Sequence, residues 1–230
     1  MNAASPPGGP GPAGSRDLVL ARVRAALRAG GADRREDAVP RDYLRSHVPA
    51  DDPGALLDLL HRNLADYRAL VHRCTPEDLP ALIAARLDAR GARTTAVPPG
   101  LPPAWLAGTG VRVLRDDGPG GPLTAARLDT VDSVLTGCAL AIAETGTLVL
   151  DAGPAQGRRL LTLVPDHHLC VVRAHGQVVA SVPLALPLLD PARPQTWISG
   201  PSATSDIELT RVEGVHGPRT LEVVLVTEAG

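Results

Sequence analysis

Lysine is absent from this chain of 230 residues, so arginine carries all of its side-chain positive charge apart from histidine. The absence excludes a Schiff-base lysine, a lysine general base and the lysine of a phosphate-binding P-loop. Phenylalanine is absent too, and there are only two Trp, two Tyr and one Met, although 44% of the residues are hydrophobic. The chain is therefore long enough for one generous domain whose core is built mainly from Leu, Val and Ala.

Basic runs and long apolar runs are also missing. The formal net charge is -2, and aromatic side chains that stack on bases are scarce, so no nucleic-acid partner is expected. No apolar segment approaches the roughly 20 residues of a membrane span, and we expect no membrane partner. The first residues, MNAASPPGGPGPAGS, lack the charged start and apolar stretch of a signal peptide, which predicts a cytoplasmic protein.

Clustered cysteines are missing as well. Cys74, Cys138 and Cys170 are dispersed, with no C-x-x-C pair among them. By themselves they cannot supply a zinc ribbon or the clustered ligands of an iron–sulfur centre. The sequence instead favours three buried, reduced thiols and no bound metal.

Familiar catalytic motifs do not occur in the chain. There is no G-x-S-x-G and no H-E-x-x-H, and the one G-x-G-x-x-G, at residues 9–14, follows no predicted strand. The sequence therefore supports neither dinucleotide binding nor standard hydrolase chemistry.

The patterns that are present divide the chain into three parts. Residues 1–14 are rich in Pro, Gly and Ala and are expected to form a disordered tail. Residues 15–90 show helical periodicity and predict an N-terminal helical region that packs on the main domain. Residues 91–230 alternate short apolar runs with Gly and Pro, which is typical of a layered α/β domain.

Three helices are predicted in the N-terminal region. The first begins at Ser15 and ends at Gly30. The second begins near Pro53, and its apolar stripe extends to Val71. The third has Thr75 as its N-cap and ends at Gly91. The members of the second stripe repeat every turn: Leu56, Leu60, Leu64, Tyr67 and Val71.

Five apolar runs in the C-terminal part predict strands. They are apolar on both faces, as in a mostly parallel sheet that helices cover on both sides. A hairpin is expected as well, with arms at 139–143 and 147–151 and Gly146 in its turn. The five runs are TTAV, GVRVL, LCVVR, TWIS and LEVVLV.

The stretch WISGPSATSDIE, residues 197–208, admits two interpretations. Ser205 and Glu208 have capping-box spacing, so the stretch could be a short helix that caps itself and ends at Gly214. The small residues 199–204 could equally form a ligand loop at the start of that helix. Asp206 and Glu208 in the first turn leave open that the loop binds ligand hydroxyls or a cation rather than a bare phosphate.

Further candidates lie at other loops. Glu144 stands beside the hairpin turn, where Thr145 and Thr147 supply hydroxyls, and we expect it to share a pocket with the 199–205 loop. His167 and His168 enter a strand, so one should face inward and the other outward, and a metal-binding pair is not favoured. His216, just beyond the predicted helix, is a candidate titrating group over the site.

Three blocks of sequence resemble the lactate utilization protein C family of stand-alone LUD-domain proteins. They are TGCALAIAETGTLVLDAG, LTLVPDHHLCVV and SGPSATSDIELTRVEGVHGPRTLEVVLV, and they span most of residues 136–226. The resemblance implies a three-layer α/β/α fold similar to ribose-5-phosphate isomerase, glucosamine-6-phosphate isomerase and the CoA-transferase-like proteins.

The resemblance also implies a function. The chain would be a non-redox subunit of an L-lactate oxidation system that produces pyruvate, contributing a small-ligand pocket or a docking surface. Iron–sulfur clusters would belong to partner subunits, and this chain would bind no cofactor. The alternative is a stand-alone enzyme acting on a phosphorylated sugar or a CoA-linked molecule, against which the missing lysine counts.

Family membership assigns no catalytic residue. The ligand-binding candidates stand at the motif positions of the three blocks: Glu144, Thr145, Gly146, Thr147, His168, Ser199, Gly200, Ser202, Thr204, Asp206, Glu208 and His216.

Overall fold

The chain forms two compact units, residues 1–43 and residues 44–230. The computed structural model describes residues 15–30, 42–49, 51–204, 212–214 and 216–227. The first unit contains helix α1 (Ser15–Gly30), which confirms the first predicted helix. The predicted disordered tail and the capping box at 205–208 lie outside the described residues.

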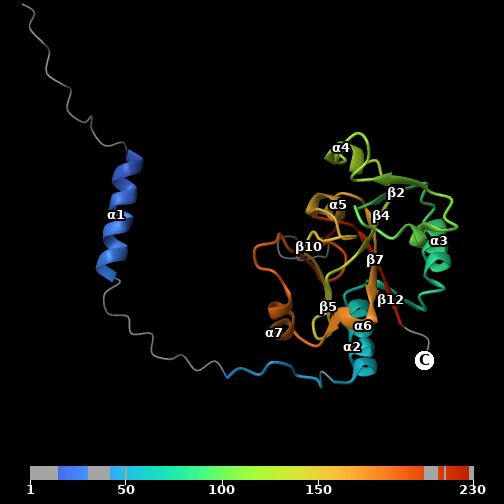
Figure 1. Ribbon diagram of the computed structural model, residues 1–230, viewed down its shortest axis with the longest axis horizontal. Coiled ribbons are helices and arrows are strands. Elements are labelled where there is room, and N and C mark those ends of the chain that lie inside the picture. Colours follow the sequence, from blue (N-terminus) through green and yellow to red (C-terminus); the bar gives the residue numbers. More distant parts are fainter. Residues whose placement is uncertain (1–14, 31–41, 50, 205–211, 215, 228–230) are drawn as a thin grey trace, which may run out of the picture. The chain divides into compact units, whose positions relative to one another are not determined.

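The second unit is organised around a six-stranded sheet in which every neighbouring pair is parallel (Figure 1). The order across the sheet is β1–β12–β7–β4–β2–β3. All five apolar runs form strands, four of them in this sheet. Its strands are β1 (Leu70–Cys74), β2 (Thr94–Val97), β3 (Arg112–Arg115), β4 (Ser133–Gly137), β7 (His167–Arg173) and β12 (Thr220–Val226).

A second sheet of four strands has the order β8–β5–β6–β9. It contains the predicted hairpin, because β5 and β6 pair antiparallel and Gly146 takes a φ of 54° in the turn. A two-stranded sheet pairs β10 with β11. The strands are β5 (Leu140–Ile142), β6 (Thr147–Leu150), β8 (Val178–Val179), β9 (Thr196–Ile198), β10 (Ala203–Thr204) and β11 (Val212–Glu213).

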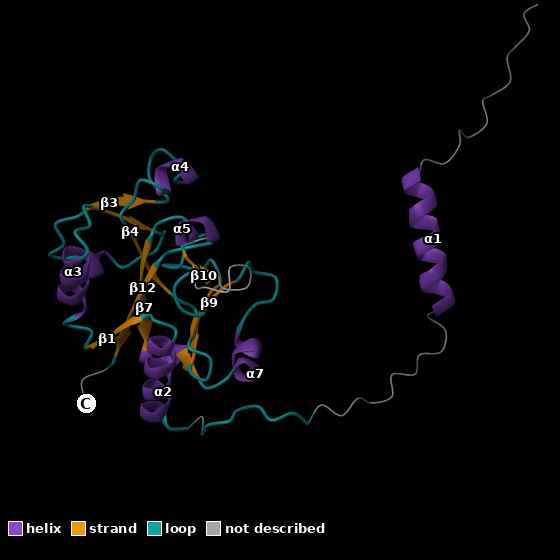
Figure 2. Cartoon of the chain, turned by 180° about the vertical axis from the view of Figure 1, so that it is seen from behind, coloured by secondary structure: helices purple, strands orange, loops and turns teal. Residues whose placement is uncertain are grey.

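Two longer helices cover opposite faces of the six-stranded sheet (Figure 2). Helix α2 (Pro53–Asp66) packs its leucines between this sheet and the second sheet. Helix α3 (Leu79–Ala89) packs on the other face, against β4, β7 and β12. The expected three-layer α/β/α arrangement with a mostly parallel sheet is therefore confirmed.

Shorter helices fill the connections. Helices α4 and α5 close one end of the core, and α7 covers the outer face of the second sheet. No helix in the described ranges combines the length and hydropathy needed to cross a bilayer. The short elements are α4 (Ala125–Leu128), α5 (Arg159–Leu163), α6 (Ala174–Gln177), α7 (Val182–Ala185) and the 3-10 helices Pro103–Leu106 and Leu186–Leu188.

The prediction that residues 15–90 are all helical is wrong at Leu70–Cys74. Helix α2 ends at Asp66, and Arg68 then takes a φ of 67°, which turns the chain back. Val71 therefore leaves the helical stripe and pairs with Val223 of β12. Because β1 is part of the main sheet, α2, β1 and α3 belong to the same compact unit as the residues after 91.

Candidate functional site

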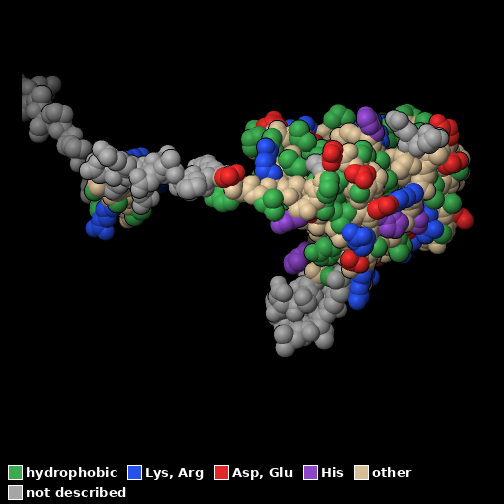
Figure 3. All heavy atoms as spheres, turned by 90° about the horizontal axis from the view of Figure 1, so that it is seen from below, with side chains coloured by type: hydrophobic (Ala, Val, Ile, Leu, Met, Phe, Trp, Pro, Cys, Tyr) green, Lys and Arg blue, Asp and Glu red, His purple; other side chains and the backbone are tan. Residues whose placement is uncertain are grey.

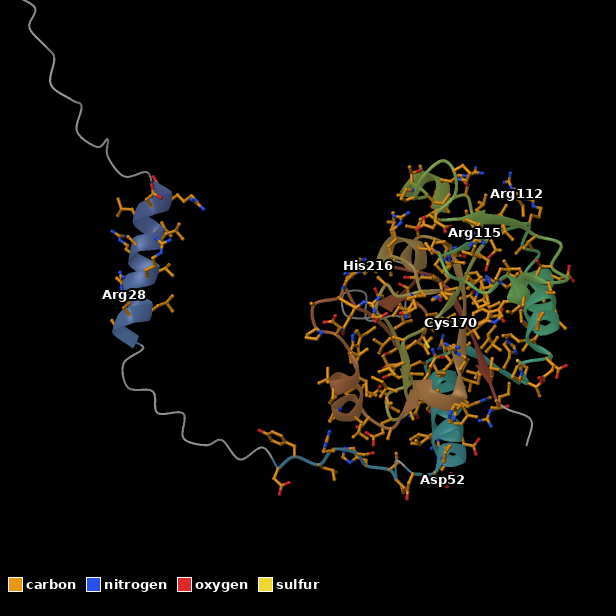
Figure 4. The ribbon with its side chains drawn as sticks, in the orientation of Figure 1. Arg28, Asp52, Arg112, Arg115, Cys170 and His216 are labelled. Carbon is orange, nitrogen blue, oxygen red and sulfur yellow. The ribbon has the colours of Figure 1, made fainter. Side chains whose placement is uncertain are left out.

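A cavity of about 390 Å³ opens at the amino ends of β7 and β12. His168 and Leu221, the second residues of these strands, form its floor together with Thr162 of α5. The 195–203 and 216–218 segments form its rim, and Figure 4 shows His216 near α5 on this side of the unit. A volume of this size suits a small organic ligand.

The rim loop at Ser199–Ala203 depends on a glycine. Gly200 has a φ of 82°, and a Cβ at this position would lie 2.7 Å from both the Cβ and the carbonyl oxygen of Tyr67. Glycine alone fits this close approach without strain. The C-terminal end of α2 therefore sets the position of the loop.

Ser202 ties the two rim segments together. Its N–H donates to Pro218 O at 2.8 Å, and Gly214 N–H donates to Ser202 O at 2.9 Å. Its hydroxyl accepts the N–H of His216 at 3.1 Å. These bonds hold His216 beside the cavity although it lies 14 positions after Ser202 in the sequence.

A chain of hydroxyl groups joins the rim to the hairpin turn. Ser199 Oγ lies 2.8 Å from Thr147 Oγ1, which lies 2.7 Å from Thr145 Oγ1. Asn63 of α2 holds the same turn by donating to Ala143 O at 2.8 Å and Glu144 O at 3.0 Å. A Cβ on Gly146 would lie 2.8 Å from the carbonyl carbon of Asn63, so this turn also requires glycine.

The structure does not bring Glu144 to the cavity. Its carboxylate accepts hydrogen bonds from Ser46 Oγ at 3.0 Å, His47 N at 2.5 Å and Val48 N at 3.3 Å. Glu144 thus fastens the segment that precedes α2, and the expected pocket shared with the 199–205 loop is not formed by its side chain. Its neighbours Thr145 and Thr147 reach the rim through Ser199.

His168 is buried in the cavity floor, and its imidazole forms a hydrogen bond with the neighbouring strand β4. Its Nε2 lies 2.7 Å from Thr136 Oγ1 of β4. Cys170 lies further along the same face of β7 (Figure 4), and both Cys170 and Cys138 belong to the core cluster that packs against α2. Hydrogen bonding to Cys170, together with burial, raises the pKa of the Cys138 thiol. Cys138 and Cys170 are free and buried, as predicted, whereas Cys74 is free but only partly buried, so the prediction of a buried thiol is wrong there.

His167 faces the opposite side of the sheet and belongs to a buried polar cluster. Its Nδ1 lies 2.8 Å from Ser133 Oγ, and its Nε2 lies 3.4 Å from Glu222 Oε1, which is long for a hydrogen bond. Glu222 Oε2 accepts from Arg86 Nε at 2.8 Å and lies 2.9 Å from His72 Nε2. The two adjacent histidines therefore face opposite sides of the sheet, but both are buried, so the prediction that one of them faces outward is wrong.

Burial and charge act in opposite directions in this cluster. Burial alone would raise the pKa of Glu222, but the approach of His167 and the hydrogen bond from Arg86 lower it to about 2. Burial lowers the pKa of His167 and outweighs the opposing effect of Glu222. The cluster therefore holds an ionised glutamate beside a neutral histidine within the core.

The lining of the cavity favours an anionic ligand. Among its described residues, Arg159 carries a fixed positive charge and none is a carboxylate. Hydroxyl groups of Ser199, Ser202 and Thr162, together with the imidazoles, add hydrogen-bonding partners. On the face seen in Figure 3, by contrast, arginines and acidic side chains are interspersed.

The predicted site residues thus separate into groups. Five line the cavity: His168, Ser199, Gly200, Ser202 and His216. Four form or flank the hairpin turn behind the rim: Glu144, Thr145, Gly146 and Thr147. Thr204 lies in β10, and Asp206 and Glu208 lie outside the described residues. The prediction that Gly214 ends a helix is wrong, because Val212–Glu213 form β11.

Four residues that the sequence analysis did not select shape the site. Arg159 and Trp197 line the cavity, whereas Asn63 and Tyr67 fix its loops from α2. No local pattern reveals Asn63 or Tyr67, since their contacts are distant in sequence. Arg159 could have been selected from the sequence, because this arginine lies just before the block that contains His168.

The residues that line the cavity lie in a region that matches a known protein family. The model of the LUD domain family matches residues 124–226, which include every described cavity residue. Lactate utilization protein C of Deinococcus radiodurans is 47% identical over 185 residues, covering 77% of this chain and 84% of that protein. Lactate utilization protein C of an Exiguobacterium strain is 33% identical over 93 residues, covering 37% of this chain and 40% of that protein.

A solved structure is similar as well. The crystal structure of a DUF162 family protein from Deinococcus radiodurans matches with a TM-score of 0.65 and 41% sequence identity. The match covers 76% of this chain and 99% of the other. The similarity thus extends beyond the LUD-domain match to most of the described α/β unit.

Proposed function

Because the chain belongs to the lactate utilization protein C family and carries its LUD domain, we propose that it takes part in oxidising L-lactate to pyruvate as a subunit without a redox centre of its own. The name of its Deinococcus relative supports a role in lactate utilization. Oxidising lactate releases two electrons and two protons, which a redox centre on another subunit would accept.

The cavity at the amino ends of β7 and β12 is the observation that carries this proposal. A 2-hydroxy or 2-oxo carboxylate has one negative charge and one adjacent oxygen. Arg159 would bind the carboxylate, and Ser202 or His216 would bind the adjacent oxygen. The chain's role would be to bind and orient this small acid.

The cysteines of the chain do not fit an iron–sulfur cluster. Cubane clusters are commonly held by four thiolates, whereas this chain has three cysteines. Cys138 and Cys170 are buried in the core beneath α2, among apolar side chains. We therefore assign the clusters to partner subunits. We also propose that the complex is cytoplasmic.

Genetics tests the role in lactate utilization. Deletion of the gene is expected to abolish growth on L-lactate but not on glucose, and the wild-type gene should restore it. Arg159→Ala should fail to restore growth, whereas Arg112→Ala, an exposed arginine on β3, should restore it. Iron–sulfur proteins should co-purify with the tagged chain. Normal growth of the deletion strain on L-lactate, with no such partner recovered, would reject the proposal.

The alternative is a stand-alone enzyme for a phosphorylated sugar or a CoA-linked molecule. The cationic Arg159 is compatible with a phosphate, but the chain has no lysine to assist it. A thermal-shift panel of sugar phosphates and CoA esters distinguishes the two. Stabilisation by one of these, and none by L-lactate or pyruvate, would favour the alternative.

A further inference from the structure

A second cavity lies at the other end of the six-stranded sheet. Its volume is about 480 Å³, and it is bordered by Arg173 and Val226, near the carboxyl ends of β7 and β12. Pro76, just after β1, lies on its border as well. In open parallel α/β sheets, the crevice outside the carboxyl ends of the strands is the usual place for a ligand.

The walls of this cavity are largely apolar. Leu79 of α3 and Val226 are buried, and Trp105 of the 3-10 helix at 103–106 packs against the core cluster that contains them. The Trp105 ring also packs toward β4, where its Cη2 atom lies 3.8 Å from the Cβ position of Gly137. A flat indole along an apolar wall suits a flat ligand, because stacking brings the largest area into contact.

Two polar side chains at the mouth of this cavity differ in whether they already have a bonding partner. Gln177 is occupied at both ends, since its Oε1 accepts Arg173 N–H at 2.7 Å and its Nε2 donates to Cys138 O at 2.7 Å. These bonds hold the segment after β7 against β4. The Arg173 guanidinium is exposed, and no carboxylate of the described residues forms an ion pair with it.

The backbone at Gly176 has open space beside it at the border of this cavity. Gly176 has a φ of 82°, and no atom lies within 4 Å of the position its Cβ would take. Among the described residues, no neighbouring atom excludes a side chain at this position. Gly176 therefore places no side chain at the border of the cavity, beside Arg173 and His175.

From these features we propose that the cavity binds a flat aromatic anion, stacked on Trp105 with its carboxylate or phosphate on Arg173. Such a ligand could be an aryl carboxylate or a nucleotide monophosphate, which share a ring and a terminal anionic group. The site is separate from the cavity that contains Arg159, because the two lie at opposite ends of the same strands. It does not depend on the role in lactate oxidation.

The two tryptophans of the chain make the test direct. Trp105 borders this cavity and Trp197 borders the other, so Trp197→Phe leaves emission from Trp105 alone. We would titrate the W197F protein with AMP, adenosine, benzoate and benzamide, exciting at about 295 nm, where tryptophan dominates the emission. AMP, benzoate or both should give a saturable change with a dissociation constant below about 1 mM, and each neutral counterpart should bind more weakly.

Variants of Arg173 test the charge. Arg173→Ala should weaken binding about ten- to hundredfold, and Arg173→Lys should recover part of it, because the charge is retained but the planar fork is lost. Arg112→Ala serves as the matched exposed-arginine control and should leave binding unchanged. Far-UV circular dichroism verifies that each variant is folded.

Several outcomes would overturn the proposal. They are the absence of a saturable signal with all four compounds, equal binding of the charged and neutral members of both pairs, and unchanged binding by Arg173→Ala. A response in Trp105→Phe protein without one in Trp197→Phe protein would place the ligand in the other cavity and overturn it too. A response to AMP alone identifies a nucleotide, and a response to benzoate alone identifies an aryl acid.

Discussion

The two ends of the six-stranded sheet carry cavities of similar size but different construction. At the amino end, loops distant in sequence meet through hydroxyl groups and two glycines that lie against α2. At the carboxyl end, the strands themselves and the first turn of α3 form an apolar wall with one arginine at its mouth. The amino-end cavity should therefore be sensitive to substitutions far from it, and the carboxyl-end cavity should not.

The largest expected effect concerns the buried cluster around Glu222, near the amino end of β12 on the face of the sheet opposite the cavity. Glu222→Ala should reduce the free energy of unfolding by about 3 to 5 kcal/mol, because it removes a buried carboxylate from its ionic partners. The control is Asp58→Ala, which breaks the exposed pair with Arg73 and should cost about 0 to 1 kcal/mol. Urea denaturation measures both, and equal effects would contradict the account.

A substitution in the rim loop should have the next largest effect. Gly200→Ala combines a positive φ with a clash against Tyr67, so it should cost about 2 to 4 kcal/mol or displace the loop. Gly108→Ala is its matched control, since Gly108 has a φ of 77° but no atom near its Cβ position. The control should cost about 1 kcal/mol. Melting temperatures that fall by the same amount would show that α2 does not constrain the loop.

Removal of a single polar side chain behind the rim should have a smaller effect. Asn63→Ala removes two hydrogen bonds to the hairpin turn and should cost about 1 to 2 kcal/mol. It should also weaken ligand binding at the amino end while leaving the Trp105 cavity unaffected. If both cavities lose affinity equally, the two ends are not independent.

Acid should destabilise the fold through the same buried cluster. The pKa of His167 is lowered on folding, so the unfolded chain binds the proton more readily and stability decreases as the pH falls below about 6.5. Glu222 adds stability above its unfolded pKa, and this contribution is lost as the pH falls from about 4.5 toward 2.

His167→Gln should flatten the first part of this pH dependence while keeping a polar group beside Ser133. The measurement is urea denaturation from pH 7 to pH 5. An unchanged slope in the variant would mean that another group is responsible for the acid sensitivity.

The sequence predicts elements whose signals are local. The apolar runs of the parallel strands, the start of α2 at Pro53 and the Gly146 turn are all visible in short windows, because burial on both faces and turn geometry constrain nearby residues. The prediction for Val71 is wrong because its spacing continues the apolar stripe of the second helix. Its place in β1 follows from pairing with Val223, about 150 residues away.

The site was less predictable than the strands, because several of its contacts join residues that are distant in sequence. Ser199, Gly200 and Ser202 could be selected because small residues in a loop allow close approach of a ligand. Glu144 has the same appearance in sequence, yet its carboxylate is bound by residues 46–48. No pattern near Glu144 indicates that partner, nor does any pattern near Gly200 indicate Tyr67.

Ligand binding at the amino end is the central claim, and Trp197 can report it directly. In Trp105→Phe protein the remaining emission comes from Trp197, which borders that cavity. L-lactate or pyruvate should change this emission in a saturable way at concentrations up to about 10 mM, and Arg159→Ala should remove the response. No saturable response to either acid, or an undiminished response in Arg159→Ala protein, would contradict the account.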